Sequence, residues 1–255
     1  MSDNDDESRV LKQEPLINHL LELRTRLLKI LIGIVVVFVP CAYFARDLFT
    51  YLSGPLLAAM PANNNLIATG VASPFLAPFK LAMLAAVALS LPWTLYQIWM
   101  FTAPALYKQE RKLIVPLLAS STLLFFAGMA FAYYVIFPII FRFFVSVAPN
   151  GVQVMTDISA YLDFVLKLFM AFGAAFEMPV AIFLIVWTGF VSTRQLGQYR
   201  PYVIIAAFAV GMLLTPPDII SQTCLAVPLY LLYELGILAA RVFLPDRAAD
   251  NDDDQ

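Results

Sequence analysis

Six long apolar stretches, separated by short polar or proline-containing segments, dominate the chain. They cover about residues 27–45, 79–103, 113–137, 159–187, 201–215 and 219–240. An α-helix needs roughly 20 apolar residues to cross about 30 Å of hydrocarbon, and every stretch but the fifth approaches or exceeds that length. The pattern therefore predicts an all-α integral membrane bundle of six transmembrane helices.

The fifth and sixth stretches are separated only by the turn sequence TPPD at residues 215–218. About 14 helical residues rising 1.5 Å each carry the fifth stretch only about 21 Å, which is short for a membrane span. Because another apolar stretch follows at once, we interpret the pair as a tight hairpin of short fifth and sixth spans. Local bilayer thinning or neighbouring protein would absorb the mismatch.

Prolines lie within the apolar stretches and between them. The prolines inside or at the ends of the stretches are Pro40, Pro92, Pro116, Pro179 and Pro228. An interior proline removes a backbone hydrogen bond and bends a helix, so a curved bundle is expected. The connections at about 46–78 and 138–158 are predicted to be long loops that cap the outer face. The first three stretches show no similarity to the last three, which disfavours an inverted-repeat transporter.

Composition agrees with a membrane protein, because 61% of the residues are hydrophobic, 13% are charged and the mean hydropathy is +0.80. Acidic residues gather at both ends of the chain. Residues 1–14 and 244–255 are therefore predicted to be disordered tails, around a membrane domain at 15–243. Twelve of the sixteen Lys and Arg residues fall on one side of the six-span arrangement. Since cytoplasmic segments carry an excess of these cations, both termini are predicted to be cytoplasmic.

Several kinds of chemistry lack the residues that they need. Cys41 and Cys224 lie within apolar stretches, where a thiol behaves as a small hydrophobe. The single histidine, His19, has no cysteine or carboxylate cluster around it, so no metal site is expected. Hydrolase, nucleotide-binding and cofactor motifs are missing. We therefore expect no enzyme and no cofactor.

Glu22 lies on the polar side of a segment that precedes the first span. That segment has one apolar helical stripe, formed by Leu16, Leu20, Leu23 and Leu27. We expect a helix at the inner membrane interface that runs into the first span. Glu22 either pairs with Arg26 at i+4, worth about 0.2–0.5 kcal/mol, or serves a ligand.

Glu110 interrupts the cations of the loop ALYKQERKL at residues 105–113. If this segment is helical, the positions three and four residues away carry no cation; they are Leu106, Tyr107, Leu113 and Ile114. Stabilisation of the dipole of the third span, worth about 0.3–1 kcal/mol, is one explanation for the acid. Our hypothesis is that Glu110 receives positive charge from another molecule.

Glu177 lies deep in the fourth span, where a carboxylate costs about 2.5–3.5 kcal/mol on insertion scales. It is either a functional acid or a neutral, hydrogen-bonded acid at the kink made by Pro179. Asp163 and Lys167, one turn apart in the same span, are predicted to neutralise each other.

Polar side chains around the last turn share one membrane level. They are Thr215, Ser221, Gln222 and Thr223, and the apolar Met212 lies at the same level. Hydrogen bonds between membrane helices contribute about 1 kcal/mol each. Internal packing and docking of an outside helix remain equally open for this group.

Taken together, six segments resemble the TatC family, the polytopic subunit of the twin-arginine protein translocase. They are HLLELRTRLL, VASPF, ALYKQERKLIVP, FMAFGAAFEMPVAI, RPYVIIAAF and GMLLTPPDIISQT, in this order over about residues 15–243. The resemblance implies a cup-shaped bundle in the bacterial inner membrane, with both ends cytoplasmic. It also implies a receptor for signal peptides with two adjacent arginines, which exports folded proteins with single-span TatA and TatB partners and the proton-motive force. A hetero-oligomer with several copies is expected, in contact with lipid but not nucleic acid.

The resemblance also assigns residues. The signal-peptide site would include Glu22, Arg24, Phe101 and Glu110. The partner-docking region would include Met212, Thr215 and Gln222. Further matching positions are Pro55, Pro92, Glu177 and Asp218.

Two other functions fit parts of the sequence. One is a proton-coupled small-solute transporter that uses Glu177 as the proton carrier. The other is a passive scaffold that gathers membrane helices through the fifth and sixth spans. Solute uptake into liposomes would support the first, and signal-peptide crosslinking would support the receptor.

Overall fold

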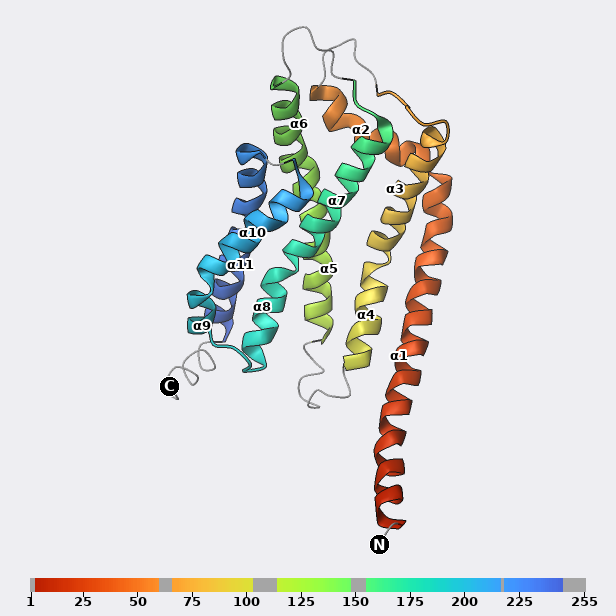
Figure 1. The fold of residues 1–255 in the computed structure, drawn as a ribbon, viewed down its shortest axis with the longest axis vertical. Coiled ribbons are helices and arrows are strands. Elements are labelled where there is room, and N and C mark those ends of the chain that lie inside the picture. The colour runs from red at the N-terminus through yellow and green to blue at the C-terminus, as the bar shows by residue number, and fades with distance from the viewer. Residues whose placement is uncertain (1–2, 60–65, 103–113, 148–154, 217, 245–255) are drawn as a thin grey trace. The chain divides into compact units, whose positions relative to one another are not determined.

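The computed structural model describes residues 3–59, 66–102, 114–147, 155–216 and 218–244, without the side chains of 3–19, 59, 99, 102 and 114. The described residues form helices almost throughout, as predicted (Figure 1). The α-helices are α1 (Asp3–Tyr43), α2 (Ala45–Ala59), α3 (Ser73–Leu89), α4 (Leu91–Thr102), α5 (Ile114–Phe131), α6 (Phe137–Ser146), α7 (Ile158–Phe176), α8 (Met178–Trp187), α9 (Thr193–Gln198), α10 (Arg200–Leu214) and α11 (Ile219–Phe243). A π-helical turn, Ala132–Ile136, joins α5 to α6.

Among the described residues, four helical segments are long and apolar enough to cross a membrane: Leu20–Tyr43, Val115–Ser146, Ile158–Trp187 and Ile219–Phe243. A fifth span arises if the pair Ser73–Leu89 and Leu91–Ile98, bent by 48°, counts as one. The fifth predicted stretch is the shorter apolar helix Arg200–Leu214. All six predicted stretches are thus helical and the chain is a multi-pass membrane protein, while six separate crossings remain a prediction.

The sixth stretch and both capping loops differ from expectation. The sixth span was expected to be short, but α11 begins directly after Asp218 and has 25 residues. The predicted loop 46–78 contains α2, and the predicted loop 138–158 contains most of α6. Pro138 lies in the first turn of α6, where a helix tolerates proline, so the apolar segment continues as helix to Ser146.

Two breaks confirm that prolines shape the spans. α3 and α4 meet at Ser90, and Pro92 lies in the first turn after the 48° bend. α7 and α8 meet at Glu177, and Pro179 lies in the first turn of α8. Each proline lacks the amide hydrogen that would have continued the preceding helix.

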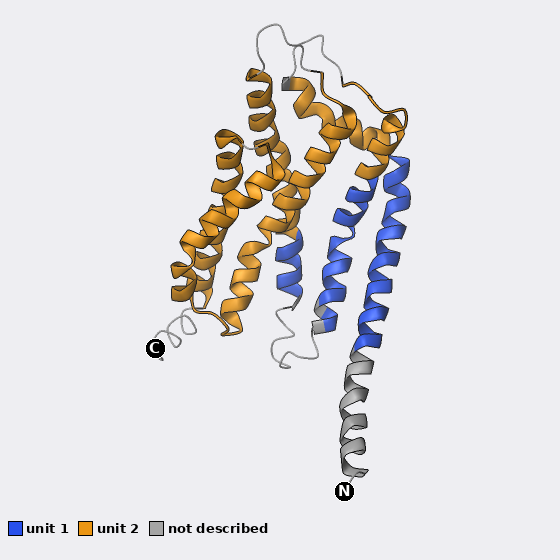
Figure 2. Cartoon of the chain, viewed as in Figure 1, with its two compact units in different colours: residues 1–44, 82–122 blue, residues 45–81, 123–255 orange. Residues whose placement is uncertain are grey.

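Figure 2 shows the chain as two compact units, residues 1–44 with 82–122 and residues 45–81 with 123–255. In the first unit, α1 lies beside α4, and Gly33 allows the indole of Trp93 to approach the α1 backbone. The second unit has an aromatic core in which Phe137 lies between the rings of Phe141 and Phe169.

α1 begins at Asp3, so residues 3–14, expected to be a disordered tail, are part of this helix. Residues 245–255 of the other expected tail lie outside the described residues. The division into tails and membrane domain remains a prediction.

Candidate functional site

Glu22 and Arg26 form the ion pair that their i,i+4 spacing predicts. Arg26 Nη2 lies 3.1 Å from Glu22 Oε1. The Arg26 side chain is 18% exposed, whereas the Glu22 side chain is 36% exposed. Glu22 therefore presents a partly accessible carboxylate that already holds one guanidinium.

Gln97 on α4 contacts the Glu22–Arg26 pair, and the sequence analysis did not single it out. Arg26 Nη1 donates a 3.1 Å hydrogen bond to Gln97 Oε1, and Gln97 is only 2% exposed. A buried amide without a partner is costly, so the Arg26 bond satisfies Gln97 as well. The available signal was a lone amide within the apolar run LPWTLYQIWMF, which marks a buried polar contact.

The other residues assigned to signal-peptide binding are distributed unevenly. Arg24 is exposed on α1. Phe101 is half-buried in the last turn of α4, one turn beyond Gln97. The structure connects Glu22 to α4 through Arg26. Glu110 lies outside the described residues, so its proximity to Glu22 remains a prediction.

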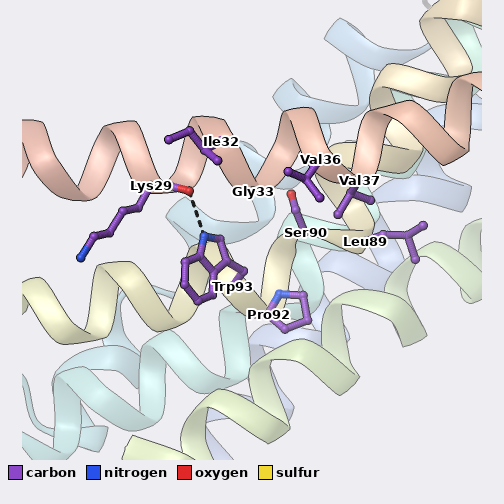
Figure 3. A pocket seen from close by; sticks show the side chains of 9 residues that line it. All are labelled: Lys29, Ile32, Gly33, Val36, Val37, Leu89, Ser90, Pro92 and Trp93. Carbon is purple, nitrogen blue, oxygen red and sulfur yellow. Dashed lines mark hydrogen bonds between the residues drawn. The ribbon is translucent and has the colours of Figure 1, made fainter.

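A groove of about 420 Å³ lies further along the same two helices. Figure 3 shows its lining, with Lys29 and Gly33 on α1 facing Pro92 and Trp93 on α4. Trp93 Nε1 donates a 2.9 Å hydrogen bond to the Lys29 carbonyl. A Cβ added at Gly33 would lie 2.5 Å from the Trp93 ring, so glycine makes this contact possible. The candidate Pro92 therefore helps to shape an apolar wall.

Pro55 lies inside α2 and deprives the Tyr51 carbonyl of its usual helical donor. The Tyr133 hydroxyl replaces that donor with a 2.8 Å hydrogen bond to the Tyr51 carbonyl. The neighbouring Leu52 carbonyl accepts from the Tyr161 hydroxyl at 2.7 Å. Tyrosine hydroxyls outside α2 therefore satisfy the carbonyls one turn before Pro55.

The prediction that Asp163 pairs with Lys167 is wrong. Lys80 Nζ lies 2.7 Å from Asp163 Oδ1, although the two residues are 83 positions apart. The packing of α3 against α7 decides the partner, and sequence spacing along one helix does not reveal it.

Glu177 occupies the single-residue junction between α7 and α8 and is half-buried. Its amide donates to the Ala174 carbonyl, and its own carbonyl accepts from the Ala181 amide at 2.9 Å. The acid thus lies at the break next to Pro179, as the sequence predicts. Its functional role remains a prediction.

The predicted docking residues differ in exposure. Met212 is 56% exposed, and Gln222 is half-buried against Gly211. Thr215 is 5% exposed, and its hydroxyl donates to the Gly211 carbonyl at 3.0 Å. Met212 is therefore accessible, whereas the Thr215 hydroxyl is engaged inside its own helix.

Asp218 caps α11, because its Oδ1 accepts a 2.6 Å hydrogen bond from the Ser221 amide. This local role follows from the Asp-x-x-Ser spacing after the turn. It explains why α11 starts where it does.

Sequence reasoning also missed Asp157, the amino-terminal cap of α7. The Thr69 hydroxyl and then the Thr69 amide bind its carboxylate, and with the Ala160 and Ser159 amides they lower its pKa to about 2. The backbones of Ile67 and Asp157 also form an isolated parallel β-bridge. Asp157 thereby fastens the segment before α3 to the start of α7.

Arg200, the first residue of α10, has a partner on α11. Its Nη2 donates to Glu234 Oε2 at 2.8 Å, and the Tyr230 hydroxyl donates to Glu234 Oε1 at 2.7 Å. This contact joins the start of α10 to the second half of α11. No group of three or more His, Cys, Asp and Glu able to hold a metal occurs among the described residues.

The family model "Sec-independent protein translocase protein (TatC)" matches residues 18–228. A Haemophilus influenzae protein named Sec-independent protein translocase protein TatC is 52% identical over 97% of this chain and 98% of its own length. The Escherichia coli K12 protein of the same name is 54% identical over 91% of this chain and 90% of its own length.

Solved structures agree with these relatives. A crystal structure described as "Twin Arginine Translocase Receptor- TatC" has a TM-score of 0.78 and 34% identity, covering 88% of this chain and 98% of its own. A second, described as the same receptor in DDM, has a TM-score of 0.79 and 35% identity. These matches support the translocase interpretation and do not support the transporter. The chain belongs to the TatC family, whose members are Sec-independent protein translocase components and not enzymes.

Proposed function

We propose that this protein is the twin-arginine translocase subunit that binds twin-arginine signal peptides at its cytoplasmic face. With TatA and TatB partners it exports folded proteins, using the proton-motive force. The observation that carries this proposal is the near full-length match to relatives named as Sec-independent translocase proteins. The likeness to crystal structures described as a twin-arginine translocase receptor supports the binding role.

Within the candidate site, Glu22 and Glu110 each receive one guanidinium of the arginine pair. A planar guanidinium forms two directed hydrogen bonds to a carboxylate, which favours arginine over lysine. The accessibility of Glu22 supports this role, because its side chain is 36% exposed although it already pairs with Arg26. Arg24 and Phe101 contribute to the same surface, and Arg111 with Lys112 anchors the loop to anionic lipid.

The topology proposed for this function has six spans and both termini in the cytoplasm of a bacterial inner membrane. Partner helices dock at Met212, Thr215 and Gln222, and several copies assemble. Glu177, Asp218, Pro55 and Pro92 are further positions that the family resemblance assigns. The excess of Lys and Arg on the predicted inner face supports this orientation.

Peptide binding to the full-length protein in lipid nanodiscs tests the proposal. Each hydrogen bond to a charged group contributes about 1.5–3 kcal/mol before solvent screening. Glu110→Lys and Glu22→Gln should therefore each weaken a twin-arginine peptide roughly tenfold to a hundredfold. Asp163→Asn is the matched control, because its acid pairs with Lys80. Unchanged affinity in a correctly inserted Glu110→Lys protein would remove Glu110 from the site.

A further inference from the structure

A single guanidinium joins the candidate acid on α1 to a buried amide on α4. Arg26 donates through Nη2 to Glu22 Oε1 and through Nη1 to Gln97 Oε1, both at 3.1 Å. All three residues belong to the first compact unit, in which α1 and α4 lie side by side (Figure 2). Glu22 is therefore held in register with the helix whose last turn carries Phe101.

The three side chains become more buried from Glu22 through Arg26 to Gln97. The exposed fraction falls from 36% for the Glu22 side chain to 18% for Arg26, and Gln97 is 2% exposed. The buried amide is fixed by packing, so it restricts Arg26, and Arg26 restricts the carboxylate. A carboxylate held in its binding conformation loses less conformational freedom when a ligand arrives.

We propose that Arg26, held by Gln97, is a specificity-determining residue that makes the Glu22 site select arginine over lysine. This inference rests on the proposed function. The Glu22–Arg26 pair has no net charge, so a visiting ammonium gains little Coulomb attraction from it. A visiting guanidinium gains directed hydrogen bonds, because a carboxylate offers two oxygens and the Arg26 bond engages Oε1.

The neutral amide at position 97 suits this role. An acid at that position would compete with Glu22 for Arg26, and an apolar residue would release the guanidinium. Gln97 orients Arg26 and leaves its charge for Glu22. A simple competition model, in which Arg26 only blocks Glu22, predicts the opposite sign: removing Arg26 would strengthen binding of the arginine peptide and increase its preference over lysine.

The test measures the affinities of a twin-arginine peptide and a twin-lysine peptide for the full-length protein in nanodiscs. The variants are Gln97→Met, Arg26→Gln, Arg26→Lys and Glu22→Gln. Ser90→Ala is the matched control, since Ser90 is a buried polar residue of the same unit whose hydroxyl bonds locally to Val87. The quantity compared is the ratio of the two affinities, which partial misfolding does not change.

Gln97→Met and Arg26→Gln should each lower the arginine-to-lysine ratio by roughly threefold to thirtyfold, the effect of one screened hydrogen bond to a charged group. Arg26→Lys should restore part of the ratio, and Ser90→Ala should keep it. If Gln97→Met is unstable, Arg26→Gln decides alone. A ratio that stays at the wild-type value in Arg26→Gln, or rises, overturns the inference. If Glu22→Gln leaves arginine binding unchanged, the proposed site itself fails at Glu22, and the selectivity inference fails with it.

Discussion

The hydroxyl of Tyr133 donates a 2.8 Å hydrogen bond to the main-chain carbonyl of Tyr51, which Pro55 leaves without a helical donor. Tyr133→Phe keeps the ring stacked on Tyr51 at 5.1 Å but removes the donor. We expect a loss of about 0.5–1.5 kcal/mol in the free energy of unfolding, the usual worth of one hydrogen bond. Thermal unfolding in detergent measures this change.

A second substitution isolates the role of Pro55. In a Pro55→Ala background, the alanine amide can serve the Tyr51 carbonyl, so Tyr133→Phe should cost much less. Tyr134→Phe is the control, because the Tyr134 hydroxyl contacts the Tyr51 hydroxyl and not the carbonyl. Equal costs of Tyr133→Phe in both backgrounds would contradict this account of Pro55.

Close approach of α5 to α7 depends on Gly128. A Cβ added there would lie 2.4 Å from the Phe172 carbonyl oxygen, which is main chain and cannot rotate away. Gly128→Ala should therefore destabilise the protein by about 1–3 kcal/mol, as overpacking usually does. Gly197→Ala is the control, since nothing lies within 4 Å of its added Cβ and alanine favours helix α9. A Gly128→Ala protein with the wild-type unfolding temperature would contradict this packing.

The Asp157 carboxylate makes the stability of the folded protein depend on pH. Its pKa is lowered from 3.8 to about 2, so the folded state favours the ionised carboxylate. The stabilisation is complete above pH about 4 and is lost as the pH falls through about 2. The unfolding temperature of the wild type should fall more steeply over that interval than that of Asp157→Asn. Thr69→Val should raise the pKa of Asp157 toward 3.8, which NMR titration of the carboxyl carbon can follow.

Exposure separates the proposed docking residues. Met212 is accessible, so Met212→Lys should reduce co-purification of a single-span partner several-fold. Thr215→Val should have a small effect, because the Thr215 hydroxyl serves the Gly211 carbonyl within α10. Equal loss of partner in both variants would show that the Thr215 hydroxyl itself contacts the partner.

Local features of this fold were predictable from the sequence. A membrane span must satisfy its own backbone hydrogen bonds, so long apolar stretches become helices whatever surrounds them. The Glu22–Arg26 pair and the breaks before Pro92 and Pro179 follow from neighbours within one turn. The continuation of helix through Pro138 was missed, because the first turn of a helix tolerates proline.

Contacts between distant segments were not predictable. Asp163 has a cation one turn away at Lys167, yet helix packing gives it Lys80, 83 positions earlier. Gln97 lies 71 positions from Arg26, and nothing in the local spacing connects them. The sequence therefore predicted only part of the candidate site. It identified Glu22, but not Gln97, which binds the Arg26 partner of Glu22.

The most direct test of the account is photocrosslinking from a signal peptide that carries a photoreactive residue beside its arginine pair. After irradiation, mass spectrometry maps the attachment positions on the full-length protein, with unlabelled twin-arginine and twin-lysine peptides as competitors. The account predicts attachment both near Glu22 on α1 and within residues 103–113, displaced by the arginine peptide but not by the lysine peptide. Attachment confined to other segments, or displaced equally by both peptides, would contradict it.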